Sequence, residues 1–164
     1  MSDDEILAAL VDRSALALTM YGEARGDARD GSSVEERIAV GCVIRNRWKR
    51  YGSFGAKEQT YRAVCLAPKQ FSCWLEEGGG SNHGHLLDVA HRLITGMPQE
   101  SSTDPLLKEC LFLADGIISG ALLDATGGAT HYFAPKAMEP AGSMPRWARG
   151  KPTRAIGTQL FLQA

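Results

Sequence analysis

The feature that most constrains this chain is an apolar helical stretch that ends in an acid. Residues 14–20 read SALALTM and are apolar on nearly every side, which is typical of a helix buried on more than one face. Leu16, Met20 and Glu23 follow one another at i, i+4 and i+7, so Glu23 falls on the apolar stripe at the helix end. Helical spacing extends further back, and we predict a helical stretch from about residue 3 to residue 21, written 3–21 below.

An acid among apolar neighbours is costly, because burial disfavours the charged form of a carboxylate. A neutral carboxylic acid near pH 7 is what protonation of a glycosidic oxygen requires, so Glu23 is a candidate general acid. The alternative is a solvated glutamate in a helix-terminal turn, paired with Arg25, since most glutamates lie in water. The spacing alone leaves both interpretations open.

Two further helices carry clear start signals. Ser33 and Glu36 have the spacing of a capping box and open the run VEERIAVGCVIRNRWKRY. Asp104 supplies an N-cap and Pro105 a first helical position for a run that ends on Gly120. The chain is therefore predicted to be mostly helical.

The remaining segments predict a shorter helix and a minor β part. Residues 85–94 have helical spacing and follow a glycine-rich loop at 78–80. Beyond Gly127, the stretches ATHYF and AIGTQLFL alternate as strands do, and a loop rich in Pro and Gly separates them. We therefore expect an α+β fold, mostly α, in which a small β-hairpin or pair of strands completes a single domain over residues 1–164.

Charge and cysteine content exclude several classes of protein. The net charge is -1 and Lys and Arg are scattered, so no nucleic-acid partner is expected. The N-terminal MSDDEILAALVDR is acidic, and no apolar run reaches membrane-spanning length, so we expect neither a signal peptide nor a membrane anchor. Without a secretory signal the cysteines are expected to be thiols, with Cys65 and Cys73 as the only locally plausible pair.

Five separated blocks carry a resemblance to a known family. They read ALTMYGEARGD, EERIAVGCVIRNR, QFSCW, GATHYFAP and PRWARGKPTRAIGTQLF. Their order and approximate spacing, from Ala15 to Phe161, resemble the SleB-type cell-wall hydrolases, the family of spore-cortex lytic enzymes. The resemblance implies a lysozyme-like, lytic transglycosylase-like domain that binds peptidoglycan glycan strands and cuts the β-1,4 bond between N-acetylmuramic acid and N-acetylglucosamine. It implies no cofactor.

The resemblance also implies roles for two acids. The family's catalytic glutamate corresponds to Glu23, and a second acid before the next helix corresponds to Glu35, with Glu36 one position away. The intervening loop DARDGSSVE is longer than is usual in the family, and Asp27 stands where the family often has Glu. A lytic transglycosylase needs one acid that protonates the leaving oxygen and then deprotonates the muramyl 6-hydroxyl, whereas a true muramidase needs a second positioned carboxylate. Both outcomes stay open.

The other blocks provide residues suited to binding N-acetyl sugars. They offer an amide, aromatic faces, hydroxyls and an imidazole, and the predicted substrate-binding residues are Gln70, Phe71, Trp74, Thr130, His131 and Tyr132. Core packing is the alternative for Phe71 and Trp74, because aromatic residues are often buried. Strand alternation requires either Tyr132 or its two neighbours to face the core, and Tyr132 is the preferred cleft residue.

Two other classes of protein compete with this interpretation. A zinc peptidase acting on peptidoglycan stems would use His83, His85 and His91, but the chain has no HExxH or CxxC motif, so no metal is expected. A phage module that binds glycan without cutting it is the second, although Glu23 lies in an intact block. The arrangement fits a bacteriophage endolysin, a monomer made in the host cytoplasm that reaches the cell wall through a holin for host lysis. A hydrolase carried in a phage particle fits almost as well.

Overall fold

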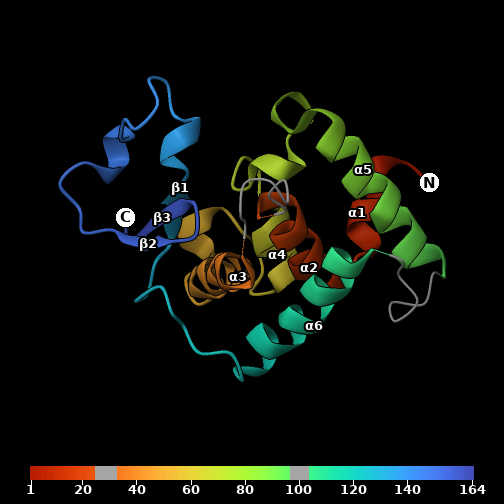
Figure 1. The fold of residues 1–164 in the computed structure, drawn as a ribbon. Helices are drawn as coiled ribbons and strands as arrows, with labels where there is room; N and C mark the ends of the chain where they lie inside the picture. Colours follow the sequence, from red (N-terminus) through yellow and green to blue (C-terminus); the bar gives the residue numbers. More distant parts are fainter. Residues whose placement is uncertain (25–32, 97–103) are drawn as a thin grey trace.

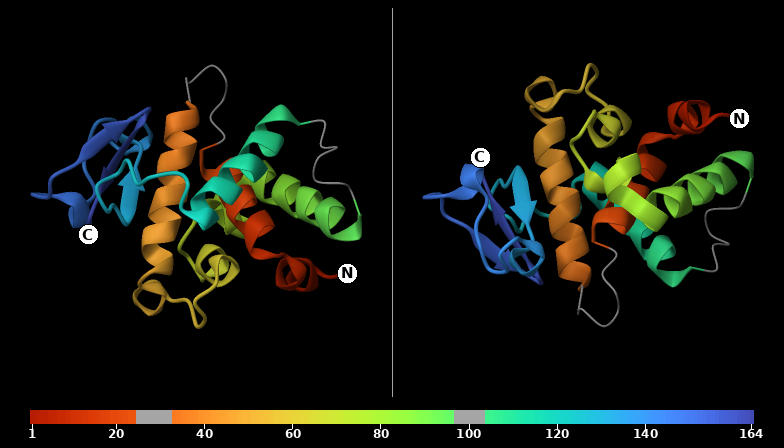
Figure 2. Two further views of the ribbon diagram at one scale, coloured as in Figure 1. Left: turned by 90° about the horizontal axis from the view of Figure 1, so that it is seen from below. Right: turned by 90° about the horizontal axis from the view of Figure 1, so that it is seen from above.

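Helix α3 divides the molecule, with a bundle of helices on one side and a small sheet on the other, as Figure 1 and both views of Figure 2 show. The computed structural model describes residues 1–24, 33–96 and 104–164, except for the side chains of residues 77–82. The helices are α1 (Asp3–Ala9), α2 (Asp12–Glu23), α3 (Val34–Trp48), α4 (Tyr61–Leu66), α5 (Glu76–Thr95) and α6 (Pro105–Ser119). Short 3-10 helices are η1 (Tyr51–Phe54), η2 (Ser72–Trp74), η4 (Pro135–Ala137) and η5 (Arg146–Ala148), and the strands are β1 (His131–Phe133), β2 (Arg154–Ile156) and β3 (Gln159–Leu162).

Helix α2 is the centre of the helical bundle. Every side chain from Ser14 to Tyr21 is buried, as predicted for the SALALTM stretch. The helix packs against α3, α4, α5 and α6, so apolar side chains on all its faces find partners. Its last residue is Glu23, and the acid therefore lies at the end of a buried helix.

The single helical stretch predicted over 3–21 is wrong, because α1 and α2 are separated at Leu10. This residue has extended backbone, with φ -64° and ψ 132°. Arg62 of α4 stabilises the break from both sides: its guanidinium donates to the Ala8 carbonyl at 2.8 Å, and its backbone N–H donates to Asp12 Oδ1 at 3.0 Å. Hydrophobic spacing could not reveal the break, since the stabilising contacts come from a distant segment.

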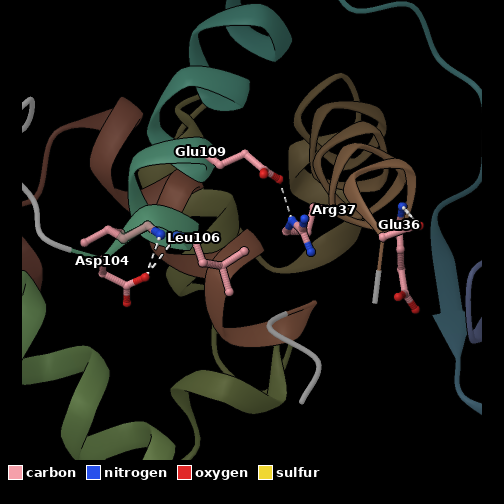
Figure 3. A network of polar contacts seen from close by, with 7 residues as sticks. Glu36, Arg37, Asp104, Leu106 and Glu109 are labelled. Carbon is pink, nitrogen blue, oxygen red and sulfur yellow. Dashed lines mark hydrogen bonds and ion pairs between the residues drawn. The ribbon is translucent and has the colours of Figure 1, made fainter. Parts of the chain in front are cut away.

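Helix α3 begins where predicted, but its capping box forms only in half. Ser33 Oγ accepts the backbone N–H of Glu36 at 3.3 Å. The Glu36 carboxylate does not return to the cap and accepts instead the hydroxyl of Thr158, in the turn between β2 and β3, at 2.8 Å. Its neighbour Arg37 points the other way and pairs with Glu109 of α6 at 2.7 Å, as Figure 3 shows. Adjacent residues thus tie α3 to the sheet and to the bundle.

Two helices complete the bundle. Helix α6 is as predicted: Asp104 Oδ1 accepts two backbone N–H groups of its first turn, at 3.0 and 3.3 Å, and Gly120 ends it with a φ of 80°. Helix α5 is longer than predicted, because it begins at Glu76 and includes residues 78–80, which the glycines indicated as a loop. Each glycine costs a helix about 1 kcal/mol relative to alanine, and packing of α5 on α1 and α2 offsets that cost. None of the helices in the described part of the chain is long and apolar enough to cross a membrane.

The β part is a three-stranded antiparallel sheet with strand order β1-β3-β2, so a third strand adds to the predicted pair. Tyr132 lies opposite Phe161 in the register of β1 and β3. The β2–β3 turn contains Gly157, whose φ is 60°, and a Cβ there would lie 3.0 Å from Glu36 Oε2. The small residue lets the turn approach α3. The mostly helical α+β fold predicted from the sequence is confirmed.

The cysteines are thiols, as predicted. Cys42, Cys65, Cys73 and Cys110 are all free and buried. Burial raises the pKa of Cys65 to about 12 and also raises the pKa of Cys110 to about 12, so both thiols stay protonated at neutral pH.

Candidate active site

The Glu23 carboxylate lies at the end of α2, where the neighbouring segment η2 holds it. The backbone N–H of Cys73 donates to Glu23 Oε1 at 3.2 Å. The Ser72 hydroxyl lies 3.4 Å from Oε1 and 3.3 Å from Oε2. Ser72 is exposed and Glu23 half-buried, so a ligand can reach the acid from solvent while η2 keeps it oriented. An acid that is both accessible and oriented meets the geometric requirement for proton transfer.

Gly22 explains how η2 comes close enough to hold the acid. A Cβ at this position would lie 2.7 Å from Cys73 Cβ and 2.8 Å from Leu86 Cδ1 of α5. Real Cβ atoms are not found that close to other side-chain carbons, so only glycine permits this approach of α2 to η2. In the YGE sequence, the glycine therefore lets α2 approach η2, and this contact orients the glutamate that follows.

Tyr132 approaches Glu23 from the sheet. Burial raises the pKa of the Tyr132 hydroxyl well above its usual value, and the negative charge of Glu23 and the nearby Cys73 raise it further. The phenol is therefore neutral at pH 7 and can donate a hydrogen bond to a carboxylate. Its ring centre lies 5.5 Å from that of Phe161, which is fully buried, so this face of β1 points toward the core. Tyr132, the preferred cleft residue, is thus brought beside Glu23.

Arg47 of α3 connects the sheet to the segment that precedes η2. Its Nε donates to the Thr130 carbonyl at 2.7 Å. Its Nη1 lies 3.4 Å from the carbonyl oxygen of Gln70 and 3.3 Å from Gln70 Oε1. The guanidinium carbon lies 4.8 Å from the ring centre of Phe71 and 5.1 Å from that of Phe54. One side chain therefore fixes the start of β1 relative to the chain that holds Glu23.

Arg47 also supplies positive charge to the site. It is only 6% exposed, and burial lowers its pKa, whereas its electrostatic contacts with Tyr132 and Glu23 act in the opposite direction. A guanidinium keeps its charge even so, because its ordinary pKa is far above neutral. It can therefore stabilise the negative charge that Glu23 carries after giving up a proton.

Phe71 and Trp74, predicted to stack on sugar rings, are both at least partly covered by protein. Phe71 is 2% exposed beneath Arg47, so the alternative of core packing applies and the ring offers no open face to a sugar. Trp74 is half-buried, packs against the main core and donates its Nε1–H to Thr19 Oγ1 at 2.9 Å.

The residues that flank Tyr132 in sequence face other surroundings. Thr130 is buried, and its hydroxyl lies 3.0 Å from His131 Nδ1. His131 is half-buried, and its ring centre lies 6.0 Å from that of Phe54 and 5.2 Å from that of Trp147. Of the residues predicted on this strand, Tyr132 therefore lies near Glu23, whereas His131 packs beside Trp147.

The two candidates for a second acid have different environments. Glu35 is exposed in the first turn of α3, and Glu36 is 1% exposed. Glu36 Oε1 accepts the Thr158 hydroxyl, and its Oε2 has no hydrogen-bond partner within the described residues. Within the described residues, Glu23 makes hydrogen bonds with Cys73 and Ser72 rather than with Glu35 or Glu36. Arg25 and Asp27, which the sequence placed near Glu23, lie outside the described residues.

Sequence reasoning did not select Arg47, Ser72 or Cys73 as site residues. The Cys73 contribution is a backbone N–H, which no residue type reveals. Arg47 did carry a signal, since it follows Val43 and Val40 at i+4 and i+7 on a buried helix face. A buried cation needs compensating acceptors, so an arginine in that pattern indicates a polar centre.

Of the histidines considered as zinc ligands, His85 belongs to a hydrogen-bond network with Tyr21 and Asp104. His85 Nε2 lies 3.0 Å from the Tyr21 hydroxyl, which donates to Asp104 Oδ2 at 2.6 Å. Within residues 1–24, 33–96 and 104–164, no group of three His, Cys, Asp or Glu side chains is placed to hold a metal ion.

Comparison with known proteins identifies the class of enzyme. A family model described as Cell Wall Hydrolase matches residues 31–162, so the chain belongs to the cell wall hydrolase family. The catalytic domain of the germination-specific lytic transglycosylase SleB from Bacillus anthracis is similar in structure, with a TM-score of 0.54 and 25% sequence identity over 93% of each chain. No curated protein matches the chain at a significant level. The protein is therefore a peptidoglycan-cleaving enzyme with a lysozyme-like fold, as predicted.

The family match begins at residue 31, after Glu23. The role of Glu23 therefore depends on the YGEARGD block and on the contacts that η2 makes with its carboxylate.

Proposed function

We propose that the enzyme cleaves the β-1,4 bond between N-acetylmuramic acid and N-acetylglucosamine by lytic transglycosylation, with Glu23 as both acid and base. The observation that carries this proposal is the carboxylate of the half-buried Glu23, which Cys73 and Ser72 orient by hydrogen bonds. Of the two candidates for a second acid, Glu35 is exposed in the first turn of α3, and Glu36 accepts the hydroxyl of Thr158. A site with one acid suits a transglycosylase, which uses the same carboxyl group twice.

The proton passes through Glu23 in both halves of the reaction. The carboxylic acid first donates its proton to the glycosidic oxygen as the bond from that oxygen to muramyl C1 breaks. Arg47 and the neutral Tyr132 hydroxyl then stabilise the carboxylate that forms. The C6 hydroxyl of the same muramyl residue attacks C1 and returns its proton to Glu23. The products are an N-acetylglucosamine end with a free 4-hydroxyl and a 1,6-anhydromuramyl end, and no water is consumed.

Gln70 is a further proposed ligand for the substrate. Its Oε1 faces Arg47, which fixes the orientation of the amide, and the side chain is half-buried. The Nε2 group makes only a long contact, 3.5 Å, with the Pro68 carbonyl. It can therefore donate to the carbonyl of an N-acetyl group. Trp74, His131 and Tyr132 are the other predicted ligands that are half-buried, whereas Thr130 and Phe71 are buried.

The test replaces Glu23 with glutamine and follows the turbidity of purified sacculi. Glu23→Gln is expected to fold normally, because the amide oxygen can still accept the Cys73 N–H, and to abolish the loss of turbidity. Glu35→Gln is the matched control, since it makes the same change at an exposed acid and is expected to retain activity. Normal lysis by Glu23→Gln would show that the assignment is wrong.

Mass spectrometry of the digest separates the two reaction types. Anhydromuramyl ends, lighter by one water, indicate transglycosylation, and reducing ends indicate a true muramidase. The muramidase alternative needs a second carboxylate. Loss of activity in Glu35→Gln, together with reducing ends, would favour that alternative over the proposal.

Two expectations stay predictions: that the protein is a bacteriophage endolysin that reaches the cell wall through a holin, and that it is a monomer. Expression of the protein alone inside bacteria is expected to be harmless, and permeabilisation of the membrane is then expected to trigger lysis. Rapid lysis without permeabilisation would contradict dependence on a holin.

A further inference from the structure

Trp147 is an exposed aromatic side chain that the fold holds in place. It lies in η5 and is 42% exposed, although its ring centre is 5.2 Å from that of His131 and 5.8 Å, edge-on, from that of Phe133. The next residue, Ala148, is fully buried in a small cluster with Phe133 and Leu162. An indole already immobilised by its neighbours loses little conformational freedom when a ligand covers its open face.

A row of ring contacts leads from Trp147 back to the Glu23 site. Its successive members are Trp147, His131, Phe54, Arg47 and Phe71, and neighbouring members lie between 4.8 and 6.0 Å apart. We call these five residues the aromatic row. Its inner end immediately precedes Ser72, whose hydroxyl contacts Glu23. The exposed indole is therefore joined through packed side chains to the segment that holds the acid.

Exposure alone would not distinguish Trp147 from an ordinary surface aromatic. Phe112 of α6 is 75% exposed, and scattered apolar side chains of this kind are normal on soluble proteins. In the described part of the chain, no ring contact involves Phe112. Trp147 differs because the aromatic row joins it to the active site, and because its surroundings are charged.

The segment around Trp147 is basic. The sequence RWARGK contains no acid, and its exposed cations are Arg146, Arg149 and Lys151. Burial lowers the pKa of His131 in the aromatic row, and the positive charges of Arg47 and Lys151 lower it further. The segment is therefore positively charged although the whole chain has a net charge of -1. Such a surface attracts an anionic ligand.

We propose that Trp147 and segment 146–151 form an outer subsite for the glycan strand. The indole stacks on a sugar ring away from the bond that is cut, and the cations bind carboxylates of the stem peptides. The inference rests on the proposed function, because it takes peptidoglycan as the substrate. Peptidoglycan fits both parts of the surface: its sugar rings have apolar faces, and its stem peptides carry free carboxylates.

The test measures binding without cutting, in the Glu23→Gln background. Co-sedimentation with purified sacculi is compared for Glu23→Gln alone and with Trp147→Ala, Trp147→Tyr or Phe112→Ala added. Trp147→Ala is expected to weaken binding about tenfold, the scale of one lost aromatic stacking contact. Trp147→Tyr keeps a ring and is expected to restore most of the affinity, and Phe112→Ala, the matched exposed aromatic, is expected to have no effect. Equal binding by all four proteins would overturn the proposal.

A second measurement covers the case in which Trp147→Ala unfolds. Soluble glycan fragments are titrated into Glu23→Gln while tryptophan fluorescence is followed, and the same titration is made with Trp147→Phe, which keeps a packed ring. The fluorescence change is expected to be smaller in Trp147→Phe. A change of the same size in both proteins would overturn the inference, because the ligand would then not reach position 147.

The charge of the subsite is tested with the triple variant Arg146→Gln, Arg149→Gln, Lys151→Gln. It is expected to weaken binding to intact sacculi at low salt, and to bind like its parent to oligomers of N-acetylglucosamine, which carry no carboxylate. Equal losses on both substrates would overturn the role of the carboxylates. Failure of Glu23→Gln itself to sediment with sacculi, together with no cutting by the natural protein, would refute the proposed function before Trp147 is tested.

Discussion

Replacement of Arg47 by methionine tests whether one buried cation holds the site together. Methionine has a similar length and fills the space of the side chain, but it cannot donate hydrogen bonds. The change removes the donor to Thr130, both contacts with Gln70 and the positive charge above Phe71. The main core that surrounds α3 is otherwise unchanged.

The expected loss of stability follows from these contacts. The 2.7 Å bond from Arg47 to the Thr130 carbonyl is short and charge-assisted, and such a bond contributes about 1.5–3 kcal/mol. The contacts with Gln70, at 3.3 and 3.4 Å, are long and contribute little. The contact with the Phe71 ring adds about 1 kcal/mol. Removing a cation whose burial lowers its pKa recovers part of this total, so the net loss is expected to be about 2–3 kcal/mol.

Urea unfolding measures the change, with the slope of the transition as a check that both proteins unfold alike. Arg50→Met is the matched control, because Arg50 is exposed and lies 5.8 Å from the Phe54 ring centre; its effect is expected to stay within about 0.5 kcal/mol. Arg47→Met is also expected to cut sacculi more slowly under conditions where it is fully folded. A loss of stability no larger than that of the control would refute the claim that Arg47 joins the sheet to the segment before η2.

Three other changes test single contacts. Gly22→Ala places a Cβ against Cys73, so it is expected to cost about 1–3 kcal/mol and to reduce activity even when folded; full activity in thermally shifted protein would contradict the role of this contact. Gly157→Ala combines a φ of 60° with contact to Glu36 and is expected to lower the free energy of unfolding by at least about 1 kcal/mol, measured by thermal denaturation. Burial raises the pKa of Cys65 from 9.0 to about 12, so between these pH values only the unfolded chain releases this proton and stability falls as pH rises. The slope from this thiol is about 1.4 kcal/mol per pH unit, and Cys65→Ala is expected to show a shallower alkaline decline; identical slopes would contradict the prediction.

Local patterns were enough for several elements of the fold. The buried helix that ends at Glu23 was predictable because apolar spacing reflects which faces of a helix are covered. The ends of α6 were predictable because Asp104 and Gly120 act on the backbone of their own helix. Each of these signals involves residues within a few positions of one another.

Contacts between distant segments decided the rest of the fold. The break at Leu10 depends on Arg62, and the Glu36 side chain turns to Thr158 although its spacing from Ser33 fits a capping box. In each case a partner far along the chain outweighs a local preference of comparable energy.

The candidate site divides in the same way. The residue types and blocks of the sequence indicated Glu23 as the candidate acid and Tyr132 as the preferred cleft residue, because the residue type fixes which chemistry a side chain can perform. The partners that orient this acid, the Cys73 N–H and the chain held by Arg47, come from segments that meet only after α2, α3 and η2 have packed together. A backbone N–H has no residue type of its own, and the approach of two helices depends on the whole core, so the tertiary structure alone could show how Glu23 is held.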